Sequence, residues 1–300
     1  MYKKILVPLD GSATAEAVLP YAEAFAAGFK TAVELLSVID IGAMTTHLSA
    51  DKLHHLDAIV AHEEKRSAVY LEDVARNFFS GVPTEQRIVR GNAVEAVLET
   101  ASQDGDTLIA MATHGRSGAT RWLLGSVAEK VLRGATHPLF LVRASTAKGS
   151  PQRIIDSIVV PLDGSALAEK ILPTVSNWAR VLDVEVALIR AFEFPAAAYY
   201  GSEEDLRDYD AFREEARKVA AGYLKAKADA LVAEGVRTVS TLTLEGPAAA
   251  EIIGYAQSAP RAVIAMSTHG RSGVRRWMLG SVTEKVVRHG ADPVLVVRGE

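Results

Sequence analysis

A glycine-rich loop that occurs twice in the chain has the composition of a polyphosphate site. Residues 113–126 read THGRSGATRWLLGS and residues 268–281 read THGRSGVRRWMLGS. Their glycines permit a close approach of the backbone to a ligand. Each loop ends in Gly-Ser at the expected start of a helix, where unpaired N–H groups and the helix dipole favour an anion. Because the loops carry arginines and no carboxylate, we expect each of them to hold phosphate.

A capping role explains part of the same pattern without any ligand. Ser126 with Glu129, and Ser281 with Glu284, fit a capping box, in which the serine bonds the N–H groups of its own helix. That explanation accounts for two residues in each copy. It does not account for the rest of the loop, which recurs between two otherwise diverged halves. The recurrence therefore favours phosphate binding.

An aspartate follows the first strand expected in each copy, Asp10 in ILVPLDGS and Asp163 in IVVPLDGS. A carboxylate at this position can bond a ribose hydroxyl, or it can cap the following helix. The residues alone leave both roles open. His114 and His269 could contact phosphate or stabilise the turn. Because no acid is paired with either histidine in the sequence nearby, we expect neither to be catalytic.

The elements that must position these residues are strands and helices in alternation. Nearly continuous apolar runs suit strands buried on both faces of a parallel sheet. The sequence predicts strands at 4–8, 32–39, 85–89, 108–111 and 139–142, and again at 158–161, 184–191, 236–242, 263–266 and 294–297. We predict an α/β fold of two doubly wound sheets, each in the order 3-2-1-4-5. That order brings the aspartate turn opposite the glycine loop.

Apolar residues at helical spacing indicate the helices between these strands. In the first copy one such stripe consists of Val18, Ala22, Phe25 and Phe29. In the second copy a long helix carries Phe212, Ala216, Val219 and Tyr223 on one face.

The match between the two halves extends along the whole chain, so one domain has been duplicated in tandem. Asp10 matches Asp163 at an offset of 153 residues, and the paired glycines and histidines of the loops match at 155. With 300 residues, each copy is long enough to bury its own core. We predict domains at 1–143 and 157–300, joined by a polar linker at 144–156.

Composition limits the class of protein. Charged residues make up 23% of the chain and the net charge is −4, so bulk charge does not indicate nucleic-acid binding. Cysteine is absent, which excludes disulfides, thiol nucleophiles and Cys-ligated zinc and is compatible with a reducing cytosol. No apolar run approaches the roughly 20 residues that span a bilayer. We expect a cytoplasmic protein whose partners include neither nucleic acid nor membrane.

The loop resembles that of the universal stress proteins, in particular their ATP-binding branch. That branch carries Gly-x2-Gly-x9-Gly-Ser/Thr after its fourth strand. Here the nine-residue spacing recurs between Gly115 and Gly125-Ser126, and between Gly270 and Gly280-Ser281. The first glycine of the family motif is replaced by Ala112 in one copy and Ser267 in the other, which narrows the approach of the backbone. The tandem arrangement also occurs in this family.

The resemblance implies an ATP site in each copy. The first site would comprise Pro8, Asp10, Val38, Ala112, His114, Gly115, Arg116, Gly125, Ser126 and Val127. The second would comprise Pro161, Asp163, Ala191, Ser267, His269, Gly270, Arg271, Gly280, Ser281 and Val282. A Mg²⁺ ion bridging the phosphates fits, since it needs few protein ligands. Because alanine is smaller than valine, we expect the second adenine pocket to be roomier and the first site to bind more tightly.

The sequence leaves three alternatives for the function of the protein. Neither a dinucleotide motif nor a P-loop is present, and no general base or nucleophile stands out beside the loops. An ATP-binding regulator of the stress response is therefore favoured over a dedicated enzyme. A slow ATP hydrolase or phosphotransferase, and a nucleotide-free structural dimer, remain as alternatives. The resemblance further implies that the halves pair through residues 139–142 and 294–297 as a dimer within one chain, and it leaves homodimerisation open.

Overall fold

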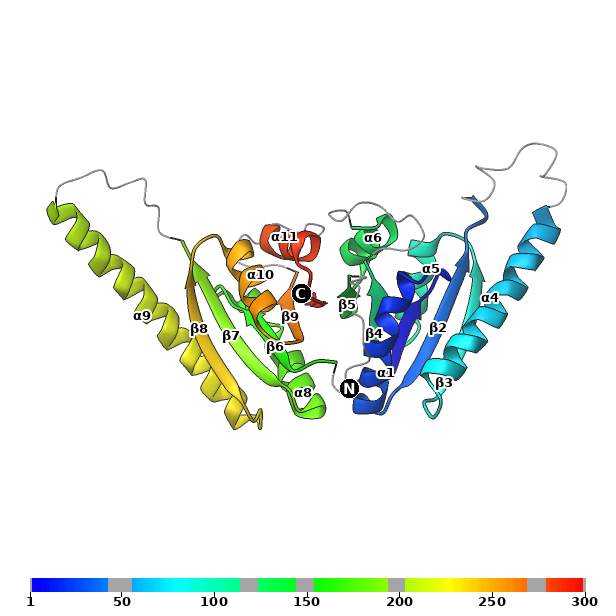
Figure 1. Ribbon diagram of the computed structural model, residues 1–300, viewed down its shortest axis with the longest axis horizontal. Helices are drawn as coiled ribbons and strands as arrows, with labels where there is room; N and C mark the ends of the chain where they lie inside the picture. Colours follow the sequence, from blue (N-terminus) through cyan, green and yellow to red (C-terminus); the bar gives the residue numbers. More distant parts are fainter. Residues whose placement is uncertain are drawn as a thin grey trace. The chain divides into compact units, whose positions relative to one another are not determined.

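The computed structural model describes residues 2–42, 56–113, 124–143, 154–193, 203–268 and 279–298, with residues 203–209 described by their backbone alone. It divides into two compact units, Met1–Ile154 (unit 1) and Ile155–Glu300 (unit 2). Each unit is a twisted parallel sheet with helices packed against it (Figure 1). The predicted linker at 144–156 falls mainly outside the described residues.

The sheet of unit 1 confirms the predicted strand order. Its strands lie in the order β3-β2-β1-β4-β5, and all neighbours are parallel. This order puts β1 beside β4, with Leu6 of β1 paired with Ile109 of β4. The carboxyl ends of both central strands therefore meet at one edge. The strands are β1 (Lys4–Pro8), β2 (Ala32–Ile39), β3 (Thr84–Arg90), β4 (Thr107–Ala112) and β5 (Leu139–Val142).

The helices of unit 1 form where the apolar spacing predicts them. The stripe from Val18 to Phe29 is buried, and Phe25 packs edge-to-face against Phe140 of β5 with ring centroids 4.8 Å apart. This aromatic pair fixes the first helix against the sheet. The helices are η1 (Ala15–Val18), α1 (Leu19–Phe29), α4 (Leu56–Phe78), α5 (Ala93–Ser102) and α6 (Ser126–Gly134).

Unit 2 repeats this plan. Its strands lie in the order β8-β7-β6-β9-β10, which is again 3-2-1-4-5 within the unit. The strands are β6 (Ser157–Pro161), β7 (Glu185–Phe192), β8 (Val239–Glu245), β9 (Ala262–Ser267) and β10 (Val294–Val297). The helices are α7 (Ala166–Glu169), α8 (Leu172–Leu182), α9 (Glu203–Ala233), α10 (Ala248–Ser258) and α11 (Ser281–His289).

The predicted strand at 236–242 is wrong at its start. β8 begins only at Val239, because Val236 lies in the turn that closes the carboxyl end of α9. Gly235 takes a left-handed φ of 94°, and the N–H of Val236 donates back to the carbonyl of Leu231 at 3.0 Å. Both Val236 and Leu231 are 2% exposed, so an apolar contact accompanies this helix ending.

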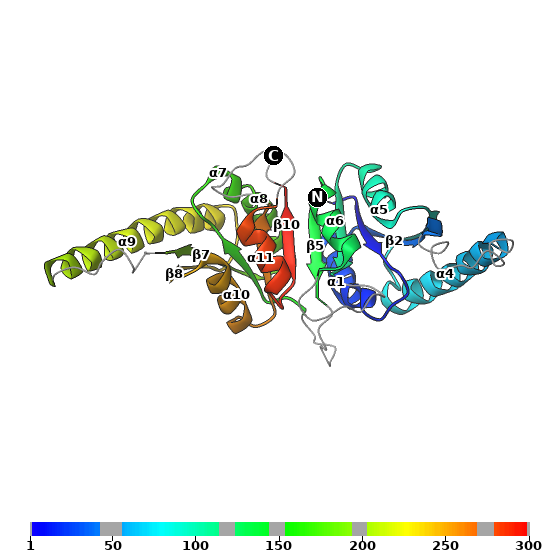
Figure 2. The same ribbon diagram turned by 90° about the horizontal axis from the view of Figure 1, so that it is seen from above.

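The face predicted to be apolar on the long helix packs only in part, at Tyr223, which is half-buried and donates its hydroxyl to Glu169 of α7. Phe212 and Val219 are each 59% exposed. Figures 1 and 2 show the first turns of α9 extending past β7 and β8, where the sheet of its own unit does not cover them. The side of α9 that packs is the neighbouring stripe of Ala220, Leu224, Ala228 and Leu231.

Candidate functional site

The turn after β1 is organised by the Asp10 side chain. Its Oδ1 accepts the N–H of Ser12 at 3.0 Å and the Ser12 hydroxyl at 2.6 Å. The Ser12 hydroxyl oxygen in turn accepts the N–H of Ala15, the first residue of η1, at 3.1 Å. The serine therefore satisfies the helix terminus, while the aspartate orients the serine.

Unit 2 builds the same turn with the same residues. Asp163 Oδ1 accepts the N–H of Ser165 at 2.9 Å, and Ser165 is the N-cap of α7, accepting the N–H of Ala168 at 3.1 Å. Gly164 between them has a φ of 87°, a conformation that favours glycine. In both units the serine supplies the cap that was one of the two roles left open for the aspartate.

The start of α6 contradicts the predicted capping box. The N-cap of this helix is Gly125, in an extended conformation, and Ser126 is already its first helical residue. The carboxylate of Glu129 pairs with Arg133 four residues later at 3.1 Å. The capping box fails because the cap position falls one residue earlier, on a glycine without a side chain. The start of α11 repeats this arrangement, with Gly280 as N-cap, Ser281 as first helical residue and Glu284 paired with Arg288.

Each glycine loop begins and ends at the sheet. The N–H of Thr113 donates to Val142 of β5 at 2.8 Å, and the N–H of Gly125 donates to the Thr113 carbonyl at 2.7 Å. The two ends of the loop are therefore bonded to each other, which brings the start of α6 to the end of β4. Unit 2 has the same bonds, from Thr268 to Val297 and from Gly280 to Thr268. His114, Gly115, Arg116, His269, Gly270 and Arg271 lie outside the described residues.

A cavity opens at the carboxyl edge of each sheet, among the turn, the strand ends and the helix start. In unit 1 its volume is about 470 Å³, and in unit 2 it is about 280 Å³. The structure brings together the predicted residues that it describes. In unit 1 these are Pro8, Asp10, Val38, Ala112, Gly125, Ser126 and Val127. In unit 2 they are Pro161, Asp163, Ala191, Ser267, Gly280, Ser281 and Val282.

Comparison with known proteins gives this architecture a family. The model of the universal stress protein family matches residues 1–143 and again residues 155–298. The chain belongs to the universal stress protein family. It carries two copies of the family domain in tandem.

Relatives of both one-domain and two-domain length match the chain. Universal stress protein Slr1230 of Synechocystis is 23% identical over 326 aligned residues, which cover 99% of this chain and 100% of the relative. Universal stress protein MJ0577 of Methanocaldococcus jannaschii is 30% identical over 161 residues, or 48% of this chain and 96% of the relative. The crystal structure of a universal stress protein from Archaeoglobus fulgidus covers 100% of both chains, with a TM-score of 0.73 and 21% identity, and shows the shared fold.

Each universal stress protein domain also uses a helix for its pocket that sequence reasoning missed. Ala93 and Val97 of α5 line the cavity of unit 1, together with Asp40 beyond the end of β2. Ala248 and Ile252 of α10 line the cavity of unit 2. The matching glycines before these helices were the available signal, since Gly91 has a φ of 140° and Gly246 a φ of 143°. A glycine at the same position in both copies therefore indicates a turn whose backbone conformation other residues rarely adopt.

The expected difference in pocket size between the two domains is wrong. Ala191 does replace Val38, yet the unit 2 cavity is the smaller one. Two other replacements reduce the volume of the unit 2 cavity, because the larger residues Ile252 and Thr283 stand where unit 1 has Val97 and Ala128. The hydroxyl of Thr283 also donates to the Ser267 carbonyl at 3.0 Å, which holds it in place.

The second universal stress protein domain has an additional polar cluster behind its aspartate turn. The Tyr223 hydroxyl and the Lys227 ammonium of α9 both donate to Glu169 of α7, at 2.9 and 2.7 Å. Arg190 of β7 lies over the Tyr223 ring, 5.0 Å from its centroid. Burial, and then the hydrogen bond to Glu169, raise the pKa of Tyr223 far above its ordinary value. In unit 1, Ser37 occupies the position of Arg190, so this cluster distinguishes the two domains.

Two classes of feature are not found in the described part of this universal stress protein. Among those residues, no three His, Cys, Asp or Glu side chains are grouped so that they could hold a metal ion. The helices described there include none with the length and apolar character needed to traverse a bilayer.

Proposed function

We propose that each unit binds ATP and that the chain is a nucleotide-dependent regulator in the stress response rather than a dedicated enzyme. The observation that carries this proposal is the cavity at the carboxyl edge of each unit. It joins an aspartate turn to the start of a helix, two features more than a hundred residues apart in the sequence. Ligands of doubly wound sheets bind at this edge, where the strand order reverses.

The phosphates would lie at the start of α6 in unit 1 and of α11 in unit 2. Ser126 and Val127 line the first cavity and contribute backbone N–H groups from the first turn of α6. Because Gly125 is the N-cap, the Ser126 hydroxyl is not used for capping, which supports a role in ligand binding. The glycine N-cap also allows a phosphate to approach the backbone closely.

The nucleoside would occupy the remainder of the cavity. Val38, Val97 and Met111 supply an apolar wall suited to the face of a purine. Asp10 lines the same cavity, opposite the helix start. A carboxylate offers about four lone-pair directions to hydrogen-bond donors, so it can accept from a ligand as well as from the protein. Asp10 and its counterpart Asp163 are therefore suited to a hydroxyl or amino group of the nucleoside.

A Mg²⁺ ion would enter with the nucleotide rather than occupy a protein site of its own. Among the described residues, the carboxylates that line the first cavity are Asp10 and Asp40, from two different strand ends. Because Mg²⁺ bound with ATP takes its ligands largely from phosphate and water, this sparse set is sufficient.

Calorimetric titration of the full chain with MgATP tests the proposal. We expect saturable binding to the unaltered chain and its loss in the double variant Asp10→Ala, Asp163→Ala, because both nucleoside contacts are removed. Asp57→Ala serves as the control, since this exposed aspartate of α4 lies outside both cavities. Undiminished ATP binding by the double variant would contradict the proposal.

Mass spectrometry of the protein denatured after gentle purification separates the alternative functions. Co-purified ATP supports a binding protein. ADP together with time-dependent phosphate release supports the slow hydrolase. The absence of nucleotide from both units, and of binding on titration, supports the structural dimer.

A further inference from the structure

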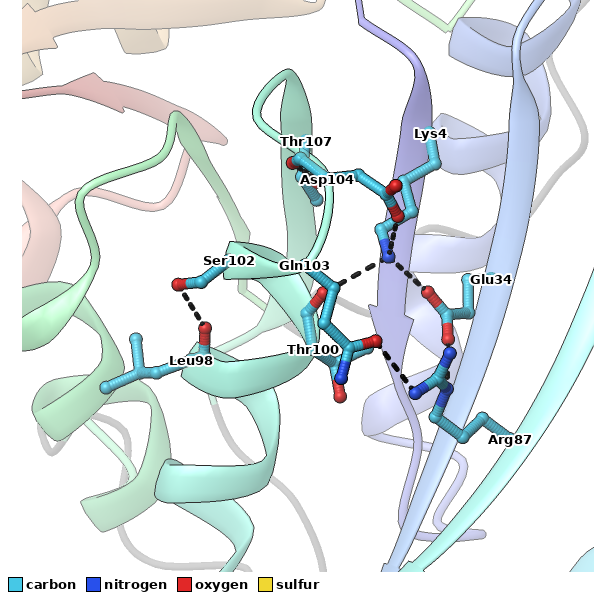
Figure 3. Close-up of polar contacts among 9 residues, drawn as sticks. All are labelled: Lys4, Glu34, Arg87, Leu98, Thr100, Ser102, Gln103, Asp104 and Thr107. Atoms are coloured by element: carbon cyan, nitrogen blue, oxygen red, sulfur yellow. Dashed lines mark hydrogen bonds and ion pairs between the residues drawn. The ribbon is translucent and has the colours of Figure 1, made fainter.

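The amino edge of the unit 1 sheet, opposite its ATP cavity, contains a buried ammonium group (Figure 3). Lys4, the first residue of β1, is 8% exposed, and its Nζ donates to Glu34 of β2 at 2.6 Å and to the Thr100 carbonyl of α5 at 3.1 Å. The same Nζ lies 2.8 Å from Asp104. Arg87 of β3 pairs with the other oxygen of Glu34 at 2.5 Å. The Lys4 side chain fills this edge of the sheet.

Unit 2 lacks every charged member of this cluster. Superposing the repeats by their strand registers puts Ser157 at the position of Lys4, Ala187 at that of Glu34 and Ala259 at that of Asp104. The space is not refilled. A cavity of about 250 Å³ remains, which is several times the roughly 30 Å³ that a water molecule occupies in the liquid. We call it the amino-edge cavity, and its lining includes Asp156, Ser157, Glu185, Ala187, Ser240 and Tyr255.

The polar groups of the amino-edge cavity favour a cation. The buried Ser157 hydroxyl has no hydrogen-bond partner among the described residues. Asp156 and Glu185 add two carboxylates, and none of the lining residues is Lys, Arg or His. Arg261 pairs with Asp156, and among the described residues the exposed Glu185 forms no ion pair. The carboxyl end of α10 also borders the cavity, and the helix dipole is negative there.

The acceptors in unit 2 differ from those that hold Lys4. The Tyr255 carbonyl, which stands where Thr100 binds Lys4, already accepts the Ser258 hydroxyl at 2.7 Å and the Ala259 N–H at 3.2 Å. The acids of unit 2 stand at other positions, because Glu185 corresponds to Ala32 and Asp156 to Lys3. A bound ammonium would therefore bond the Ser157 hydroxyl and these carboxylates.

We propose that the amino-edge cavity of unit 2 binds a small primary alkylammonium ion, which takes the place that the Lys4 side chain occupies in unit 1. Ser157 retains the β-carbon of that lysine but has neither its other methylenes nor its ammonium, and Ala187 and Ala259 are smaller than Glu34 and Asp104, so the cavity is large enough for such an ion. The apolar part of the ligand would contact Val186 and Ala187, as the lysine methylenes contact their neighbours in unit 1. This site lies at the opposite end of β6 from Pro161 and does not depend on the proposed function.

Calorimetric titration of the full chain with n-butylammonium chloride tests this site, because that ion has the atoms of a lysine side chain. We expect saturable binding of one ion per chain. Neutral n-butanol and anionic butyrate should bind at least about tenfold more weakly, since hydrogen bonds to charged groups are the stronger ones. Absence of saturable binding at millimolar concentrations, or equal affinity for n-butanol, would overturn the proposal.

Two variants locate the binding. Ser157→Lys places a tethered ammonium in the amino-edge cavity and should abolish n-butylammonium binding. Glu185→Gln removes one charge without filling the cavity and should weaken binding by about tenfold. Glu72→Gln, the same change on an exposed part of α4, is the matched control and should bind as the unaltered chain does. If Ser157→Lys folds and binds n-butylammonium with unchanged affinity, the ion binds elsewhere and the site is refuted. If Ser157→Lys does not fold, unchanged affinity in Glu185→Gln refutes the site in the same way.

Discussion

At the scale of single residues, two serines of similar sequence context have different positions. Ser12 follows Asp10-Gly11 and satisfies the N–H of Ala15. Ser126 follows Gly125 and stands inside its helix, on the wall of the cavity. The capping role that the sequence offered as an alternative for Ser126 is filled at the other site, by Ser12. A capping box and an anion-binding helix start can have the same amino-acid sequence, and only the backbone conformation of the preceding residue distinguishes them.

The two serines should therefore respond differently to the same substitution. Ser12→Ala removes a hydrogen bond at a helix terminus and is expected to lower the free energy of unfolding by about 1 kcal/mol. Ser126→Ala should leave that free energy within about 0.5 kcal/mol of the unaltered value and weaken ATP binding. Urea unfolding and calorimetric titration of both variants measure the two effects. Equal changes in stability would show that Ser126 also supports its helix.

Most residues of the candidate site could be predicted because duplication shows them twice. Asp10 and Asp163 recur in the same short motif, as do the glycines at the helix starts. The pocket residues of α5 and α10 were missed because alanine and valine carry no chemical signal in a sequence. Their place in the site follows from packing alone.

At the scale of elements, the ion cluster of Lys4 joins three strands and a helix at one edge of unit 1. Glu34 is 3% exposed, so removing Lys4 leaves a buried carboxylate with Arg87 as its remaining cationic partner. Lys4→Met should lower the free energy of unfolding by about 3–5 kcal/mol. Chemical denaturation followed by circular dichroism measures the loss. Glu34→Met in the same chain removes the buried carboxylate that has lost one of its two cationic partners. The double variant should therefore recover part of that loss, and no recovery would contradict a charge-based explanation.

The cluster also predicts how stability depends on pH. Burial opposes the charged form of Lys4, but hydrogen bonds with Asp104 and Glu34 outweigh it and raise its pKa. The stabilisation from Lys4 is therefore complete below its unfolded pKa and is lost as pH rises through the folded value. The hydrogen bond from Lys4 lowers the pKa of Asp104, so its contribution is present above the unfolded pKa and is lost as pH falls through the folded value.

We therefore expect the stability difference between the unaltered chain and Lys4→Met to be constant from about pH 5 to pH 9 and to shrink on both sides. Denaturation curves across that range check the expectation. A difference that grows towards acid pH would contradict the stated direction for Asp104.

Strand positions followed from the sequence because buried parallel strands read as nearly continuous apolar runs, and the strand order followed from a common doubly wound arrangement. The face of α9 did not follow. Phe212 and Val219 satisfy helical spacing as well as Ala220 and Leu224 do, and only the sheet decides which stripe is covered. The start of β8 was misread for a similar reason, since Val236 is apolar but packs on the helix that precedes it.

At the scale of the whole molecule, the two units share a fold but not their cavities. The unit 1 cavity of about 470 Å³ lies within the usual range for ligand sites, whereas the unit 2 cavity of about 280 Å³ falls just below it. The volume of neither cavity could be predicted from one substitution. Relative to unit 1, Ala191 enlarges the unit 2 cavity whereas Ile252 makes it smaller. The amino-edge cavity likewise depends on residues far apart in the chain that become neighbours only in the sheet.

The larger first cavity should give the tighter ATP site. Asp10→Ala is then expected to remove the high-affinity phase of an ATP titration and leave the weaker one, while Asp163→Ala does the reverse. Direct calorimetry of the two single variants, compared at equal MgATP concentrations, measures the ranking. Equal affinity at the two remaining sites would show that cavity size does not set it.

The two ends of β6 have a consequence for stoichiometry. β6 is five residues long: Pro161 at one end borders the carboxyl-edge cavity, and Ser157 at the other borders the amino-edge cavity. In unit 1 the corresponding strand has a cavity at its carboxyl end and Lys4 at its amino end. With both proposals, the duplicated chain would carry an odd complement of ligands, two nucleotides and one amine, because the third place exists only where one copy has a serine and the other a lysine.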